Sequence, residues 1–66
     1  MHITLNGEHR EFHDGLSVAD LINELQLNHR RLAVEINQEI LPRDAYDCRK
    51  VAPGDVVEIV HFIGGG

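Results

Sequence analysis

The chain has 66 residues, 42% of them hydrophobic, and a formal net charge of −5 at pH 7. This length and apolar content fit one small domain over residues 1–66 and exclude intrinsic disorder. The acidic balance argues against nucleic-acid binding, which needs a basic face, and suits docking to a basic surface on a protein partner. No apolar run approaches the roughly 20 residues that cross a bilayer, and no signal peptide is visible, so we expect a cytoplasmic protein.

The first predicted element is a β-hairpin. Residues 1–6 alternate apolar and polar side chains, and this period of two indicates a half-buried strand. Asn6-Gly7 follows, a strong turn signal because both central positions of a type I′ turn need positive φ. We expect residues 8–13 to return as a second, more polar strand.

An amphipathic helix is predicted next. The hydroxyl of Ser17 can accept a hydrogen bond from the amide of Asp20, and this capping-box pattern starts a helix. The apolar residues with the spacing of one helical face are Val18, Leu21, Ile22 and Leu25. We expect the helix to end near residues 27–28.

The second half of the chain predicts three more strands. Residues 32–36 alternate again, Asn37-Gln38 turns the chain, and residues 39–41 form a short strand. Residues 43–50 have no clean period and predict an irregular connection with one helical turn around Tyr46. Residues 56–63 form the last and most β-prone strand.

These elements predict an α+β fold in which a mixed sheet of four to five strands wraps around one helix. The apolar character of the last strand favours a central position beside the first strand. On its inward face we expect Val57, Ile59 and Ile63, together with His61. On its outward face we expect Val56, Glu58, Val60 and Phe62.

Three glycines, Gly64, Gly65 and Gly66, follow this strand. Glycine cannot fill a core and loses much backbone freedom when it is ordered, so we expect residues 64–66 to be a flexible tail. Three residues reach about 10 Å, and without β-carbons they can pass through a narrow tunnel. The candidate functional group is therefore the α-carboxylate of Gly66, and no side chain is expected to be catalytic.

A docking patch for a partner is predicted beside the tail. Val60 and Phe62 share the outward face with Glu58, and protein interfaces favour apolar and aromatic anchors. The alternative for the two apolar side chains is burial under the connecting segment. A wider acidic docking surface is also possible, with a merely solvated surface as its alternative, and its members would be Asp44, Asp47, Asp55 and Glu58.

Metal and thiol chemistry are not expected. Cys48 is the single cysteine, which excludes an intramolecular disulfide and a CxxC motif, and we expect it to be a half-buried apolar filler. The histidines are scattered without the spacing of metal ligands, and they are His2, His9, His13, His29 and His61.

Four stretches in a fixed order cover most of the chain. They are residues 1–7, DGLSVADLI at 14–22, AVEIN at 33–37 with Pro42-Arg43 after it, and residues 54–66 with their glycine ending. Each stretch is a weak signal alone. In this order and spacing they resemble the ThiS family of thiamine-biosynthesis sulfur carriers, whose fold is the ubiquitin-like β-grasp.

The resemblance implies a protein co-substrate rather than an enzyme. A ThiF-like, E1-like adenylyltransferase would adenylate the carboxylate of Gly66, and a persulfide sulfur donor would convert the adenylate to a thiocarboxylate. A ThiG-like thiazole synthase would then use this sulfur for the thiazole ring of thiamine. ATP and Mg²⁺ would be bound by the adenylating partner and not by this chain. We expect the chain alone to be a monomer.

Three alternatives share the fold. The small subunit of molybdopterin synthase, or a related sulfur carrier, would use the same chemistry with another acceptor enzyme. A covalent protein modifier would leave Gly66 in isopeptide linkage to lysines. A non-covalent binding module like the TGS domains, which residues 15–21 also resemble, would not need the glycine ending.

Overall fold

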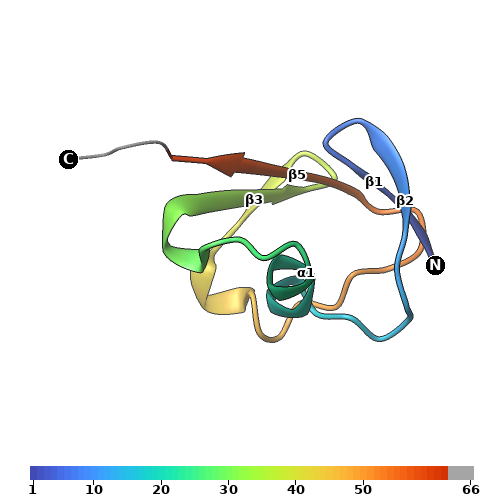
Figure 1. The fold of residues 1–66 in the computed structure, drawn as a ribbon, viewed down its shortest axis with the longest axis horizontal. Helices are drawn as coiled ribbons and strands as arrows, with labels where there is room; N and C mark the ends of the chain where they lie inside the picture. The colour runs from blue at the N-terminus through green and yellow to red at the C-terminus, as the bar shows by residue number, and fades with distance from the viewer. Residues whose placement is uncertain (63–66) are drawn as a thin grey trace.

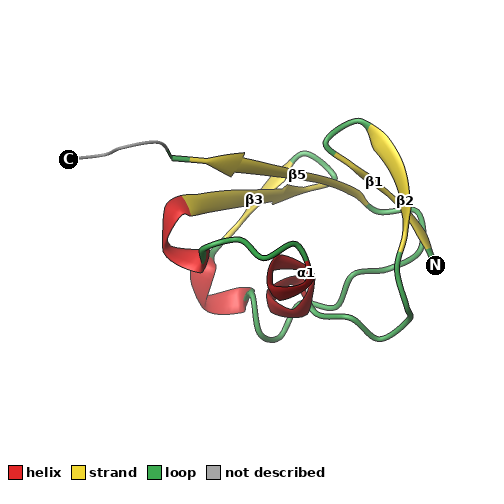
Figure 2. Cartoon of the chain, viewed as in Figure 1, coloured by secondary structure: helices red, strands yellow, loops and turns green. Residues whose placement is uncertain are grey.

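A five-stranded mixed sheet curves over one α-helix in the computed structural model, which describes residues 1–62 (Figure 1). The strands are β1 (His2–Leu5), β2 (Glu8–Glu11), β3 (Leu32–Ile36), β4 (Glu39–Leu41) and β5 (Val56–His61). Their order in the sheet is β2-β1-β5-β3-β4. The helix α1 (Val18–Glu24) and the short 3₁₀ turn η2 (Arg43–Ala45) lie on the same side of the sheet (Figure 2). The predicted α+β fold, with the last strand in the centre beside the first, is confirmed.

Both hairpins of the sheet are closed by two-residue turns with positive φ. The first turn has φ of 49° at Asn6 and 83° at Gly7, and the second has 52° at Asn37 and 70° at Gln38. Such turns match the right-handed twist of the strands that they connect. Both turns were predicted from the sequence, and they fix which side chains of β1 and β3 face the helix.

The predicted capping box is present at the start of α1. The amide of Asp20 donates to Ser17 Oγ at 3.0 Å, and the amide of Ser17 donates to Asp20 Oδ2 at 3.1 Å. These bonds satisfy amides that have no partner within the first helical turn.

The helix ends at Glu24, earlier than predicted. Gln26 adopts the left-handed conformation with φ of 59°, and the amide of Leu27 donates to the carbonyl of Ile22 at 3.1 Å. This pattern is a Schellman cap, in which an apolar residue beyond the helix packs back on it. The apolar positions Leu25 and Leu27 therefore pack against the core from the cap. A second 3₁₀ turn, η1 (His29–Arg31), follows and was not predicted.

The core fills the space between α1 and the concave face of the sheet. Val18, Leu21 and Ile22 of the helix have no exposed surface, and neither has Val57 of the central strand. Leu16, just before the helix cap, is equally buried. The other buried apolar residues are Ile3, Leu5, Ala19, Leu32, Val34, Ile36, Tyr46, Val51 and Ile59.

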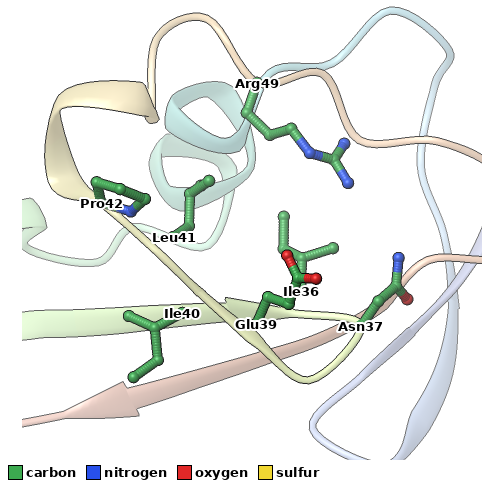
Figure 3. A pocket seen from close by; sticks show the side chains of 7 residues that line it. All are labelled: Ile36, Asn37, Glu39, Ile40, Leu41, Pro42 and Arg49. Carbon is green, nitrogen blue, oxygen red and sulfur yellow. The ribbon is translucent and has the colours of Figure 1, made fainter.

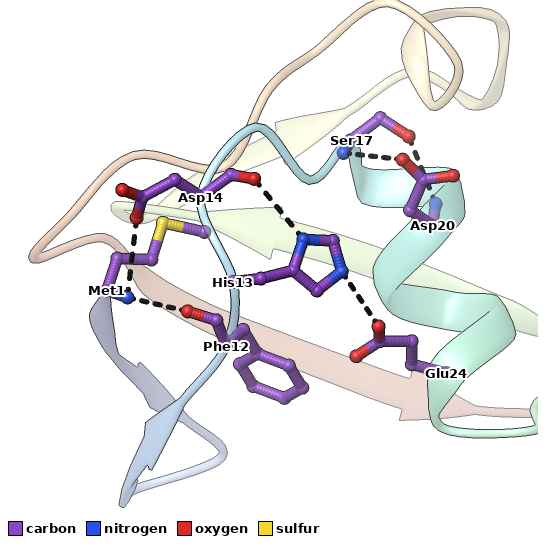
Figure 4. A network of polar contacts seen from close by, with 7 residues as sticks. All are labelled: Met1, Phe12, His13, Asp14, Ser17, Asp20 and Glu24. Carbon is purple, nitrogen blue, oxygen red and sulfur yellow. Dashed lines mark hydrogen bonds and ion pairs between the residues drawn. The ribbon is translucent and has the colours of Figure 1, made fainter.

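A polar network ties the connection between β2 and α1 to the helix (Figure 4). His13 Nε2 lies 2.9 Å from Glu24 Oε1, and His13 Nδ1 lies 3.2 Å from the carbonyl oxygen of Asp14. Both partners are acceptors, so the doubly protonated ring satisfies both contacts. The carbonyl of Asp14, followed by the Glu24 carboxylate, raises the pKa of His13 above its ordinary value.

We expect this raised pKa to make the stability of the fold depend on pH. A group with a raised folded pKa contributes fully below its unfolded value of about 6.5, and the contribution is lost as pH rises through the folded value. His13→Ala should therefore lower the melting temperature more at about pH 5 than at about pH 8. His9→Ala, on the exposed strand β2, is the control. An equal decrease in melting temperature at both pH values for His13→Ala would contradict the raised pKa of His13.

Candidate docking surface and tail

Strand β5 leads directly to the glycine residues, and its neighbours hold it on both sides. On one side it runs parallel to β1, with Thr4 opposite Val56 and Leu5 opposite Val57. On the other side it runs antiparallel to β3 along its whole length, from Ile36 opposite Val57 to Leu32 opposite His61. The amide of Phe62 donates to the carbonyl of Arg31 at 2.8 Å, so the chain is anchored up to its last described residue. The predictions for Ile63, Gly64, Gly65 and Gly66 lie outside the described residues.

The predicted docking residues are all exposed on the convex face of the sheet. Val60 is 59% exposed and Phe62 is 53% exposed, and the side chain of Glu58 between Val56 and Val60 is exposed as well. Burial under the connecting segment, the alternative for Val60 and Phe62, is therefore wrong. The geometry gives an apolar pair with a carboxylate beside it, and the pair ends two residues before Gly64. Their role in docking stays a prediction.

The convex face extends from β5 to the neighbouring strands. Glu35 of β3 lies directly opposite Glu58, and both residues line a hollow of about 420 Å³ together with Gln38 and Val56. Like charges at directly opposite positions disfavour a sheet. Within residues 1–62, neither carboxylate forms an ion pair with a lysine or arginine. The face is thus both apolar and acidic, which fits the predicted docking to a basic protein surface.

Asp55 is not part of an acidic docking surface, and its prediction as such is wrong. It is only 7% exposed. Its Oδ2 accepts from the amide of Ala52 at 2.8 Å and from Arg49 Nη2 at 3.4 Å, while its Oδ1 accepts from Asn37 Nδ2 at 3.1 Å. The carboxylate closes the turn that leads into β5. The turn η2, which contains Asp44 and is followed by Asp47, lies on the helix side of the sheet (Figure 2). The side chain of Glu58 is exposed on the opposite, convex face.

A second hollow, of about 270 Å³, lies beside the edge strand β4 (Figure 3). Its polar lining includes Asn37 and Arg49. Asn37 is already bonded to Asp55 and to the amide of Val56, and Arg49 is bonded to Asp55 and to the carbonyl of Lys50. These bonds hold the start of β5 in place. Asn37 and Arg49 therefore have a structural role that requires no ligand in the hollow.

Cys48 is exposed, so its predicted role as a half-buried filler is wrong. No group of three potential ligands among His, Cys, Asp and Glu is close enough to hold a metal ion within the part of the chain that the structure describes. Among residues 1–62, no helix has the length and apolar character that a membrane span requires.

Comparison with known proteins agrees with this geometry. The sequence model of the ThiS family matches residues 3–66. The chain belongs to the ThiS family. The chain is similar to the thiamine biosynthesis protein ThiS from Geobacter metallireducens, for which a crystal structure is known. The two sequences are 36% identical, the alignment covers all of both chains, and the TM-score is 0.87. The β-grasp fold expected for a ThiS protein is therefore confirmed.

Two curated relatives are informative about the ThiS family. The sulfur carrier protein ThiS of Bacillus subtilis is 37% identical, over 97% of this chain and 98% of its own length. The thiazole synthase of Paramagnetospirillum magneticum is 46% identical over all of this chain. The chain spans only 20% of the length of that second relative.

Proposed function

We propose that the chain is a sulfur carrier of thiamine biosynthesis and that it carries sulfur as a thiocarboxylate on Gly66. The observation that supports this most is the end-to-end similarity to the sulfur carrier protein ThiS of Bacillus subtilis. The structure adds a central strand, paired on both sides, that ends at His61, three residues before Gly64. No catalytic side chain is needed in this role, so the chain acts as a co-substrate of its enzymes.

The chemistry requires activation because a carboxylate is a poor electrophile. An E1-like adenylyltransferase transfers AMP from ATP to the Gly66 carboxylate and releases pyrophosphate. The terminal sulfur of a persulfide then attacks the acyl carbon and displaces AMP. A thiol cleaves the resulting sulfur–sulfur bond and leaves the thiocarboxylate on the chain. Mg²⁺ and basic side chains that stabilise the phosphate charge belong to the adenylating enzyme.

A thiazole synthase is the proposed acceptor of the sulfur. The support is that the Paramagnetospirillum magneticum thiazole synthase contains a stretch similar to this entire chain. Carrier and synthase in one polypeptide would meet at a high effective concentration, as expected for proteins that work together. We place the reaction in the cytoplasm, where ATP is available for the adenylation.

The proposed function is tested by reconstitution. The protein is incubated with the adenylating enzyme, Mg-ATP and a persulfide donor, and its intact mass is measured. We expect a gain equal to the difference between sulfur and oxygen, located on Gly66 by fragmentation. Oxidation of Met1 or of the exposed Cys48 adds almost the same mass, so Cys48→Ser and a sample without ATP serve as controls. An unchanged Gly66 in the presence of an active enzyme would refute the proposal.

The docking patch gives a separate prediction. Phe62→Ala should raise the KM of adenylation about tenfold without changing the melting temperature, because an exposed aromatic anchor contributes to binding and little to the core. Ile40→Ala is the matched control, since Ile40 is 78% exposed on β4. The measurement is ATP–pyrophosphate exchange at varied carrier concentration. Equal KM values for the two variants would remove Phe62 from the docking patch.

A further inference from the structure

The main-chain groups of β5 alternate between its two neighbours. The amide of Phe62 donates to Arg31, and the carbonyl of Val56 accepts from Asn37, so even-numbered residues bond toward β3. The carbonyls of Asp55 and Val57 accept from β1 and its turn, so odd-numbered residues bond toward β1. The main-chain amide of His61 therefore points to the β1 side.

Strand β1 does not reach this part of β5. Its pairing ends with Leu5 opposite Val57, and the chain then turns away at Asn6. The side chain of Asn6 provides the last contact, because its Oδ1 accepts from the amide of Ile59 at 2.8 Å. Figure 1 shows β5 continuing well past the β1–β2 hairpin. Within residues 1–62, no strand pairs with His61 on this side.

We infer that this open edge of β5 receives an extended segment of the adenylating enzyme, which adds to the sheet as a further strand. The carbonyl of Ile59 and the main-chain groups of His61 would supply the hydrogen bonds, since the amide of Ile59 is already bonded to Asn6. The exposed side chains of Val60 and Phe62 would set the position of the segment along the edge. Addition of a strand to an exposed sheet edge is a general mode of recognition.

We assign the open edge of β5 to a segment of the adenylating enzyme because the edge lies close to Gly66 along the chain. It ends at His61, five residues before Gly66, so an enzyme that holds the Gly66 carboxylate has to pass beside it. Hydrogen bonds to the main chain at this point would fix the register of the glycines, which have no side chains that could do so. A second copy of the chain is disfavoured, because each copy carries a formal net charge of −5 and the edge is short. This inference rests on the proposed function.

Proline at position 61 tests the inference. His61→Pro removes an amide that points to the open edge, and it leaves the bonds between β5 and β3 unchanged. His61→Ala removes the same side chain and keeps the amide. We expect His61→Pro to raise the KM of adenylation on the order of tenfold relative to His61→Ala. Equal KM values for the two variants, with wild-type protein still adenylated, would overturn the strand addition and leave the proposed function standing.

Amide hydrogen exchange of the wild-type protein gives a second test that does not depend on how the proline variant folds. The His61 amide should exchange fast in the free carrier and at least tenfold more slowly in the complex with the adenylating enzyme. The Phe62 amide, bonded to Arg31 in the free protein, is the internal control and should be protected in both states. An unprotected His61 amide in the complex would overturn the inference. Protection of the His61 amide at high carrier concentration without enzyme would also overturn the inference, and it would indicate pairing with a second copy of the chain.

Discussion

A chain without Gly65 and Gly66 is expected to fold like the full chain and to form neither adenylate nor thiocarboxylate. The core cluster is built from residues between Ile3 and Ile59, so removal of the last two glycines takes nothing from it. The truncation moves the terminal carboxylate back by about 7 Å, and the group can no longer reach the position where the enzyme activates it. Pyrophosphate exchange and thermal melting measure the two effects separately.

Gly65→Ala is the matched variant for this prediction. It keeps the length and the carboxylate and adds one β-carbon, so it tests the narrow enzyme tunnel together with the backbone freedom that only glycine has. We expect an adenylation rate lowered at least tenfold with an unchanged melting temperature. A truncated chain that is still activated at the normal rate would contradict the role of the tail, whereas normal activation of Gly65→Ala alone would contradict only the tunnel.

The second large effect is a loss of fold stability in β5, the strand that precedes the tail. Two adjacent valines of this strand are compared. Val57 has no exposed surface, whereas Val56 is 44% exposed on the opposite face. We expect Val57→Ala to lower the free energy of unfolding by about 1–4 kcal/mol, because it leaves a cavity between the sheet and α1. Val56→Ala should cost only about 0.5 kcal/mol, as is usual for surface positions. For a domain of this size the first loss is a large share of the total stability.

Chemical denaturation with a common slope measures this difference. The two variants remove the same atoms from the same strand, so β-propensity and unfolded-state effects are similar in both. Equal losses for Val56→Ala and Val57→Ala would contradict the assignment of the two faces of β5, and with it the placement of Val60 and Phe62 on the convex face.

Most of the sheet could be predicted because its signals are local. The alternation of Leu32, Val34 and Ile36 has only one physical explanation, a strand with one buried face. The turns at Asn6-Gly7 and Asn37-Gln38 both begin with asparagine, which tolerates positive φ better than most residues. The exposure of Val60 and Phe62 followed from the same alternation along β5.

The errors have separate physical causes, some local and some dependent on distant parts of the chain. Asp55 appeared to be a surface acid because its partner Arg49 and its neighbour Asn37 meet it only in the folded turn before β5. The end of α1 was misplaced because Gln26, which is not a usual left-handed residue, makes the cap. The open edge at His61 depends on where β1 stops relative to β5, a register that no single stretch of sequence determines.

The proposed function requires that the main-chain carboxyl group of Gly66 carries sulfur in the cell. The most direct measurement is the high-resolution intact mass of the protein purified from its native cells under non-reducing conditions, with fragmentation of its C-terminal residues. We expect a population in which one oxygen of the Gly66 carboxylate is replaced by sulfur. A chain that continues beyond Gly66 without being trimmed, or one that carries only the ordinary carboxylate in cells actively making thiamine, would contradict it.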